Sequence, residues 1–284
     1  MASLPACERH PVGEGLALHL HRWAGAGPPV LLVHGLASNL HLWDGVAERL
    51  AAGGHDVVAV DLRGHGRSDT PDGGYDVPTV AGDLAGLVRR LGLHRPVVAG
   101  QSWGGNLVVE LAWAEPELVG AIACVDGGWI ELRRRFPEWD ECWEVLQPPA
   151  LDGLDWAVLE AGVRSGREGW PEPGIAGTLA SFERRADGSA ARRFSVEHHR
   201  LALRGLWEHA PTARFADVRA PVLLVPVDTG EQGWTTGKRK GVAEAERLLH
   251  RSRTSWFEGD HDVHASQPDE VAALLQELAT GAGA

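Results

Sequence analysis

Short apolar runs alternate with stretches of helical spacing along most of this 284-residue chain. Most of the runs lack polar alternation, as expected for strands that helices cover on both faces. The alternation predicts an α/β fold with a mainly parallel sheet. The predicted strands are Leu16–Trp23, Val30–His34, Val57–Asp61, Val97–Gly100, Ala121–Val125, Val222–Val227 and Ser255–Glu258.

The stretches between these runs predict helices at Trp43–Ala52, Val77–Leu91, Trp103–Ala114, Gly241–Leu249 and Pro268–Leu278. In the second of them, apolar residues recur at three- and four-residue steps and form one stripe. Asp76 precedes this helix as a suitable N-cap, and Gly92 follows it as a stop. Pro268 suits the first turn of the last helix.

The segment 127–211 breaks this rhythm. It contains no clear strand, is divided by turns rich in Gly and Pro, and holds six of the 12 tryptophans. We interpret it as a helical cap inserted over the carboxyl ends of the strands, which leaves a core of residues 1–126 and 212–284. Indole rings in a cap favour an apolar or aromatic substrate, because they offer large flat contact areas.

Composition and charge exclude several classes of protein. A net charge of −12 argues against binding to nucleic acid. No apolar run reaches the roughly 18 residues of a membrane span, and Glu8 and Arg9 interrupt the place where a signal peptide would be apolar. We therefore expect a cytoplasmic protein with neither a membrane nor a nucleic-acid partner.

Several polar residues are interpreted as structural. The basic clusters 133–135 and 238–240, and the pair His198-His199, are expected to be solvated surface. The three cysteines show neither disulfide pairing arithmetic nor metal-ligand spacing, so we expect reduced thiols that pack as small apolar residues. These are Cys7, Cys124 and Cys142.

The clearest chemical signal is Gly100-Gln101-Ser102-Trp103-Gly104, which lies between a predicted strand and a predicted helix. A nucleophile on such a tight turn needs small neighbours two residues away on each side, and the two glycines meet this need. Ser102 then stands at the start of a helix, where free N–H groups and the helix dipole stabilise negative charge. The N–H of Trp103 is one expected oxyanion donor.

This motif resembles the nucleophile elbow of the α/β-hydrolase fold family, and the resemblance extends over nearly the whole chain. Val33-His34-Gly35-Leu36 is similar to the family's oxyanion segment, and 61–68 to the turn after the next strand. The resemblance implies the α/β-hydrolase fold, with the Leu36 N–H as second oxyanion donor. His34 is expected to shape this loop by hydrogen bonding, and His34 and Trp129 are candidates for the substrate pocket.

Among 14 histidines, His261 occupies the position that matches the family's catalytic histidine, in the loop 258–264. An imidazole with a pKa of about 6.5 can accept the proton of Ser102 and return it to a leaving group. His264 remains an alternative base. The cluster 260–264 also allows a metal site, but no further ligands with familiar spacing accompany it, so we expect no metal. Nothing resembles a flavin or nucleotide site, so we expect no cofactor.

The acid of the triad stays open between two aspartates. Most relatives carry it in a loop after a strand that opens like Pro221, but here that position is Gly230, and Asp228 is a nearby carboxylate. Asp126 ends the strand Ala121–Val125, where haloalkane dehalogenases and thioesterase domains carry their acid. We favour Asp126 and keep Asp228 as the alternative.

Together these residues predict a serine esterase that cleaves a small, apolar or aromatic carboxylic ester through an acyl-enzyme on Ser102. A lactonase or carbon–carbon hydrolase would use the same triad, and a ligand-binding member of the fold without turnover is a further alternative. Serine at the elbow argues against dehalogenases and epoxide hydrolases of this kind, which use Asp. The sequence does not predict the substrate itself or the oligomeric state.

Overall fold

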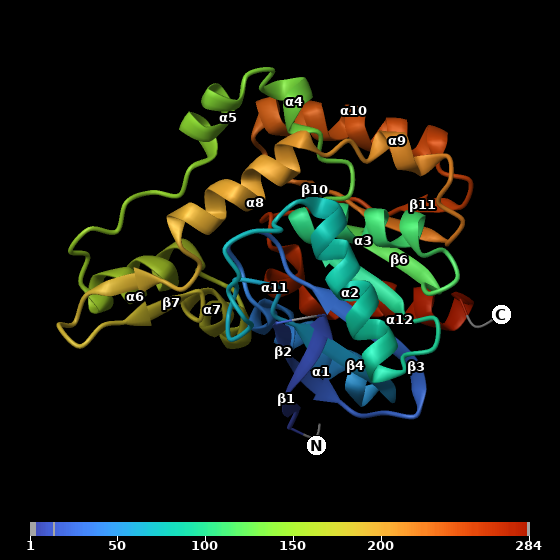
Figure 1. The fold of residues 1–284 in the computed structure, drawn as a ribbon, viewed down its shortest axis with the longest axis horizontal. Coiled ribbons are helices and arrows are strands. Elements are labelled where there is room, and N and C mark those ends of the chain that lie inside the picture. The colour runs from blue at the N-terminus through green and yellow to red at the C-terminus, as the bar shows by residue number, and fades with distance from the viewer. Residues whose placement is uncertain (1–3, 14, 283–284) are drawn as a thin grey trace.

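An eight-stranded sheet forms the centre of the molecule (Figure 1). The computed structural model describes residues 4–13 and 15–282. Every neighbouring pair from β4 to β11 is parallel, whereas β1 and β2 pair antiparallel, so the predicted mainly parallel sheet is confirmed. In spatial order the strands are β1 (Ala6–Gly13), β2 (Leu16–Trp23), β4 (His55–Val60), β3 (Gly27–Val33), β5 (Val97–Gln101), β6 (Ala121–Val125), β9 (Val222–Val225) and β11 (Ser252–Thr254).

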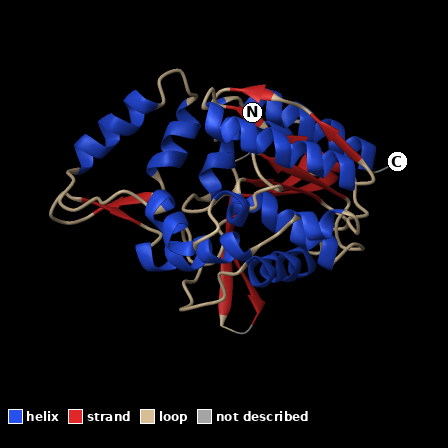
Figure 2. Cartoon of the chain, turned by 90° about the horizontal axis from the view of Figure 1, so that it is seen from above, coloured by secondary structure: helices blue, strands red, loops and turns tan. Residues whose placement is uncertain are grey.

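Helices cover both faces of this sheet (Figure 2). One face packs against α2 (Val77–Leu91) and α3 (Trp103–Ala114), and the other against α1 (Asp44–Ala52) and α12 (Pro268–Ala282). Because side chains alternate along a strand, Leu31 and Val33 of β3 join the first core, while Val30 and Leu32 join the second. Two buried faces explain why the strand sequences are apolar throughout.

The best-defined predicted helix, α2, begins and ends as expected. The Asp76 carboxylate accepts a hydrogen bond of 2.9 Å from the Thr79 N–H, and Gly92 takes the left-handed conformation with φ of 65°. The predicted bounds of α3 are also confirmed. By contrast, α10 (Gln232–Leu248) begins well before the predicted Gly241, because the Gly and Thr residues in its first half obscure the helical pattern.

Three strand predictions need correction. Strand β1 was not predicted; it is a polar edge strand whose side chains alternate between the sheet and solvent. The predicted strand Val222–Val227 is divided at Pro226 into β9 and β10 (Val227–Asp228), since proline has no N–H for the ladder. Of the last predicted strand, Ser255–Glu258, only β12 (Phe257–Glu258) forms a strand, and it pairs with β10; β11 lies just before the predicted range.

The segment 127–211 forms helices that gather on one side of the sheet (Figure 1). The expectation that it contains no strand is wrong: β7 and β8 form a hairpin, each too short for an alternating pattern to show. Its elements are α4 (Leu132–Arg135), α5 (Trp139–Leu146), α6 (Trp156–Gly166), α7 (Glu172–Leu179), β7 (Phe182–Arg184), β8 (Ala190–Arg192) and α8 (Val196–Glu208). The short elements elsewhere are η1 (Leu40–Trp43), α9 (Thr212–Phe215) and α11 (Val263–Ser266).

Of the residues expected at the surface, one is buried and one is largely covered. His199 lies on the inner side of α8, and burial lowers the pKa of its ring to about 4. The side chain of Lys238 in α10 is only 13% exposed. Within residues 4–13 and 15–282, the structure has no helix with the length and apolar character needed to cross a membrane.

Candidate active site

Ser102 stands on a strained turn between β5 and α3. Its backbone has φ of 54° and ψ of −118°, a conformation that costs a residue other than glycine about 1–3 kcal/mol. The turn is tight enough that a Cβ on Gly100 would lie 2.1 Å from the carbonyl oxygen of Gly104. The Ser102 N–H donates to the carbonyl of Val125 at 2.9 Å, which ties the turn to the end of β6. The surrounding backbone therefore holds a partly exposed serine in place.

The loop after β3 runs directly beside this serine. A Cβ on Gly35 would lie 3.2 Å from the Ser102 Cβ. His34 is fully buried: its Nδ1–H donates to the Gly35 carbonyl at 2.7 Å, and its Nε2 accepts from the Leu62 N–H at 3.0 Å. His34 thus shapes the loop, and with no exposed surface it is not placed to line a substrate pocket.

Two backbone N–H groups belong to the two segments that meet at Ser102. They belong to Leu36, in the loop after β3, and to Trp103, the first residue of α3. Among the described residues neither N–H donates a hydrogen bond to another protein group. The helix dipole adds a partial positive charge at the position of Trp103.

Asp126 meets His261 near the carboxyl end of β6. The Nδ1 of His261 lies 2.6 Å from Oδ2 of Asp126, while Oδ1 of the same carboxylate accepts from the Val227 N–H at 3.0 Å. Burial alone would raise the pKa of Asp126, but the hydrogen bond from His261 and the charges around it bring that pKa below its ordinary value. The acid next to His261 is therefore ionised at neutral pH.

The pKa of His261 is shifted in the opposite direction. Burial disfavours the charged ring, but the hydrogen bond to Asp126 and the negative charge of Asp262 outweigh it and raise the pKa of His261 above 6.5. About half of the side-chain surface of His261 remains exposed to solvent. The ring can thus exchange a proton with a group outside the protein.

Lys238 also binds Asp126, although its cluster was expected to be solvated surface. Its Nζ lies 2.6 Å from Oδ1 and 2.8 Å from Oδ2 of Asp126, and it donates to the Val227 carbonyl as well. This positive charge opposes protonation of His261 and lowers its pKa, though by less than the carboxylates raise it. Nothing in the local sequence marks Lys238, because its partner Asp126 lies 112 residues away in the chain.

Asp228 lies apart from this group. Its carboxylate accepts from the Gly230 N–H at 3.0 Å, from Thr235 Oγ1 at 3.1 Å and from Arg239 at 2.9 Å, and the Gly230 hydrogen bond leads the lowering of its pKa. Within the part of the chain that the structure describes, it makes no hydrogen bond to His261. Of the two predicted acids, the structure brings Asp126 to His261 and gives Asp228 other partners.

The His261 loop is held between the serine turn and the segment 127–211. Gln101 Nε2, from the residue before Ser102, donates to the His261 carbonyl and to Asp262 Oδ1, both at 3.2 Å. The indole of Trp170, which lies just before α7, donates to Asp260 Oδ2 at 2.8 Å. His261 is therefore anchored at its backbone by the neighbour of the serine.

Two other predicted site residues lie in the core. His264 is fully buried with its ring centre 4.3 Å from that of Trp43, and burial lowers its pKa to about 3, so it is not placed to act as a base. Trp129 is 6% exposed and packs under α10, where a Cβ on Gly241 would lie 3.0 Å from its Cδ1. The structure gives Trp129 a packing position, whereas the sequence suggested the pocket.

Known proteins resemble this chain over the regions just described. A family model described as alpha/beta hydrolase fold matches residues 28–157. The esterase Rv0045c of Mycobacterium tuberculosis is 30% identical over 297 residues, which cover 96% of this chain and 88% of that protein. The uncharacterized protein Rv2715 of the same organism is 38% identical over 109 residues, so the match spans 32% of that relative's length.

Solved structures agree on the fold. The crystal structure of E-2-(acetamidomethylene)succinate hydrolase has a TM-score of 0.79 at 24% identity, covering 96% of this chain and 98% of that one. A structure of the M. tuberculosis esterase Rv0045c has a TM-score of 0.72, also at 24% identity, covering 98% and 93%. From its strand order, its serine turn and these matches, the chain belongs to the α/β-hydrolase fold family.

Proposed function

We propose that this protein is a serine esterase that cleaves small carboxylic esters through an acyl-enzyme on Ser102. The observation that carries the proposal is the 2.6 Å contact of His261 with the buried Asp126, in a loop anchored by the residue next to Ser102. A relative named as an esterase matches along 96% of the chain. Serine at this turn, rather than aspartate, separates the chain from an Asp-nucleophile mechanism.

The chemistry follows from the hydrogen-bond pattern. Because Nδ1 of His261 donates to Asp126, its Nε2 lone pair is the free base that takes the proton of the Ser102 hydroxyl. The serine oxygen attacks the ester carbonyl, and the N–H groups of Leu36 and Trp103 stabilise the oxyanion. His261 then protonates the departing alcohol, and a water deprotonated by the same ring hydrolyses the acyl-enzyme.

Asp126 serves as the acid in this proposal, and Lys238 is a positioning residue that holds it. Asp126 keeps the imidazole in the correct tautomer and stabilises its protonated form. Lys238 contacts both carboxylate oxygens, so it restrains the rotation of the carboxyl group without reaching the substrate. Its positive charge also keeps His261 less basic than Asp126 alone would make it.

The segment 127–211 is proposed to act as a cap over the core of residues 1–126 and 212–284. Three hydrogen bonds tie it to the core: the Trp170 indole donates to Asp260, and Asn39 Nδ2 donates to the Gly177 carbonyl and the Ser181 hydroxyl, both at 2.8 Å. The indole rings of this segment favour a small substrate with an apolar or aromatic group. The expected substrate is a free small molecule.

A fluorophosphonate probe tests the nucleophile directly. The parent protein should be labelled covalently, and Ser102→Ala should not, while circular dichroism confirms that the variant is folded. p-Nitrophenyl esters of increasing chain length, assayed beside lactones, then define the substrate class. Absence of labelling in a folded parent protein would contradict the esterase proposal. Faster turnover of lactones than of esters would change the proposed substrate class from esters to lactones.

A further inference from the structure

Three potential metal ligands meet at the opposite edge of the molecule from α10, where β1 pairs with β2. In the antiparallel register Cys7 lies directly opposite His21, and His19 lies two residues from His21 along the same strand. Alternation places all three side chains on one face of the sheet. One ligand atom from each of the three residues lies within 4.8 Å of the other two.

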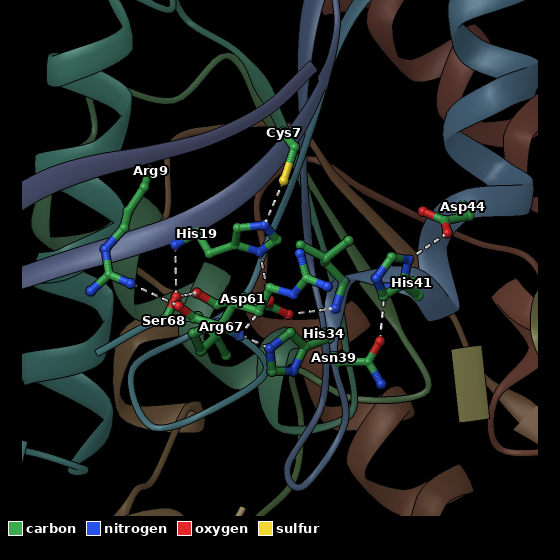
Figure 3. A network of polar contacts seen from close by, with 12 residues as sticks. Cys7, Arg9, His19, His34, Asn39, His41, Asp44, Asp61, Arg67 and Ser68 are labelled. Atoms are coloured by element: carbon green, nitrogen blue, oxygen red, sulfur yellow. Dashed lines mark hydrogen bonds and ion pairs between the residues drawn. The ribbon is translucent and has the colours of Figure 1, made fainter. Parts of the chain in front are cut away.

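His19 is held in the tautomer that a metal ligand requires. Its Nδ1 lies 2.8 Å from Oδ2 of the buried Asp61, and its Nε2 lies 3.0 Å from Cys7 Sγ; Figure 3 shows this line of three side chains. Burial opposes ionisation of Asp61, but the His19 hydrogen bond and two backbone N–H groups lower its pKa. In the neutral ring, Nδ1–H therefore donates to the carboxylate and the Nε2 lone pair faces the thiol. A carboxylate behind an imidazole is the usual support of a metal-binding histidine.

His21 supplies the third ligand, a ring nitrogen without another use. Its Nδ1 is buried and has no hydrogen-bond partner among the described residues. Burial and the neighbouring His41 ring lower the pKa of His21, so the ring is neutral at pH 7 and can donate a lone pair. Buried polar atoms in native proteins are rarely left unsatisfied, and a bound cation would satisfy this one.

We propose that Cys7, His19 and His21 bind a divalent cation of the Zn²⁺ class. One thiolate and two imidazoles are ligands that this cation prefers, with water in the fourth position. On binding, the Cys7 thiol releases its proton to solvent and its sulfur coordinates the ion. Cys7 is exposed, so the ion reaches the site from water.

The distances allow such a site after a small adjustment. Around a tetrahedral Zn²⁺, sulfur and nitrogen ligands are about 3.3–3.8 Å apart. The sulfur of Cys7 lies 3.0 Å from His19 Nε2, slightly closer than the ion requires, and the other separations stay within 4.8 Å. A rotation of the partly exposed His21 ring closes the remaining gap. Sequence spacing gave no sign of this site, because only the strand register brings Cys7 to the histidines.

His21, His41 and Asp44 form a second group with atoms within 4.8 Å. This group contains no thiolate, and its own members already pair, since His41 Nδ1 lies 2.8 Å from Asp44 Oδ2. We therefore place the ion at Cys7. His41 then serves as a matched control, because it contacts His21 without belonging to the proposed ligand set.

Cobalt spectroscopy tests the proposal on the full-length protein, reduced and stripped of metal by a chelator. Co²⁺ should produce a thiolate charge-transfer band in the near ultraviolet at one equivalent, and Zn²⁺ should abolish it by displacement. Cys7→Ser should lose the band and bind Zn²⁺ at least about tenfold more weakly by calorimetry. His41→Gln should keep both the band and the affinity, and circular dichroism checks that each variant folds.

The proposal is overturned if the parent protein shows no thiolate band or if the band survives in Cys7→Ser. Loss of binding in His41→Gln together with retained binding in Cys7→Ser would also overturn it, because the ion would then lie at His41. None of these readouts requires turnover of an ester. The metal site and the proposed esterase function therefore stand or fall separately.

Discussion

The molecule contains two buried aspartates that each bind a histidine in the same way. In one pair, Asp126 binds His261 through Oδ2 and Nδ1 at 2.6 Å; in the other, Asp61 binds His19 through the same atoms at 2.8 Å. The surroundings differ. His261 belongs to a loop anchored beside a serine with free N–H groups, whereas the Nε2 of His19 faces the thiol of Cys7. An aspartate sets the tautomer in both pairs, and the groups beyond the imidazole are the reason for the two proposed roles, proton transfer at His261 and metal binding at His19.

The two aspartates also balance their charge differently. Asp126 carries an ion pair with Lys238, while Asp61 accepts hydrogen bonds from the backbone N–H groups of Leu40 and Arg67. Backbone donors belong to the fold and cannot be replaced singly. A lysine can be, so substituting Lys238 can change the pKa of the His261 pair, whereas side-chain substitution leaves the two backbone donors to Asp61 in place.

The surroundings of His261 and of His19 should differ most in how a substitution affects ester hydrolysis, and Ser102→Ala should have the largest effect. Removing the nucleophile should lower kcat/KM for a p-nitrophenyl ester by about 10⁴-fold or more. Cys7→Ser, measured beside it, should stay within about twofold of the parent, because a surface substitution away from the site has little effect. More than a hundredth of parental activity in folded Ser102→Ala would remove the serine from its proposed role.

A second pair of substitutions tests which aspartate, Asp126 or Asp228, acts as the acid of the triad. Asp126→Asn should lower kcat by about 10⁴-fold, since an amide no longer fixes the tautomer of His261. Asp228→Asn is the matched control and should cost less than about tenfold, because a bystander does not act on the imidazole. Both are assayed on one ester at one pH. Retention of more than a tenth of the activity by both variants would show that neither aspartate is the acid.

The pH profile tests the role of Lys238. His261 acts as a base only when neutral, so activity should fall as the pH drops through its pKa, which lies above 6.5. Lys238→Met removes a charge that lowers this pKa, so the acidic limb of kcat/KM should move to higher pH, by less than about one unit. Lys240→Met, at an exposed position, should leave the limb in place. An unchanged or lower limb in Lys238→Met would contradict the assignment.

The smallest expected effect is on the metal-free stability of the β1 edge. Without metal, Cys7→Ser should change the free energy of unfolding by no more than about 0.5 kcal/mol, because Cys7 is exposed. With Zn²⁺ at 100 times its dissociation constant, the parent should gain about 2.7 kcal/mol, and Cys7→Ser should gain much less. Urea unfolding with and without Zn²⁺ measures both numbers. Equal stabilisation of the two proteins would place the ion elsewhere.

Local signals accounted for much of the fold. The helix α2 could be predicted from its apolar stripe, from Asp76 and from Gly92, because each of these signals acts on the residues close to it in the chain. The turn at Ser102 could be predicted for the same reason, since the glycines that it needs are two residues away. Strand β1 was missed because an edge strand buries little and keeps a polar sequence.

Contacts between distant segments were beyond the reach of these signals. The spacing of motifs left Asp126 and Asp228 both open, and the path of the chain after β6 and β9 brought the first to His261 and the second to Arg239. Lys238 meets Asp126 across 112 residues of sequence. Its basic neighbours on α10 gave the cluster the appearance of ordinary surface.

By itself, then, the sequence determined the layered α/β fold, the serine turn and the loop that carries His261, because these depend on local spacing and on glycines at tight positions. The tertiary structure alone decided which carboxylate faces His261, that Lys238 supports that carboxylate, and that Cys7 lies against His19. The physical reason is that hydrogen bonds and ion pairs depend on distances of about 3 Å. Such distances are set by strand register and helix packing, which no short stretch of sequence encodes.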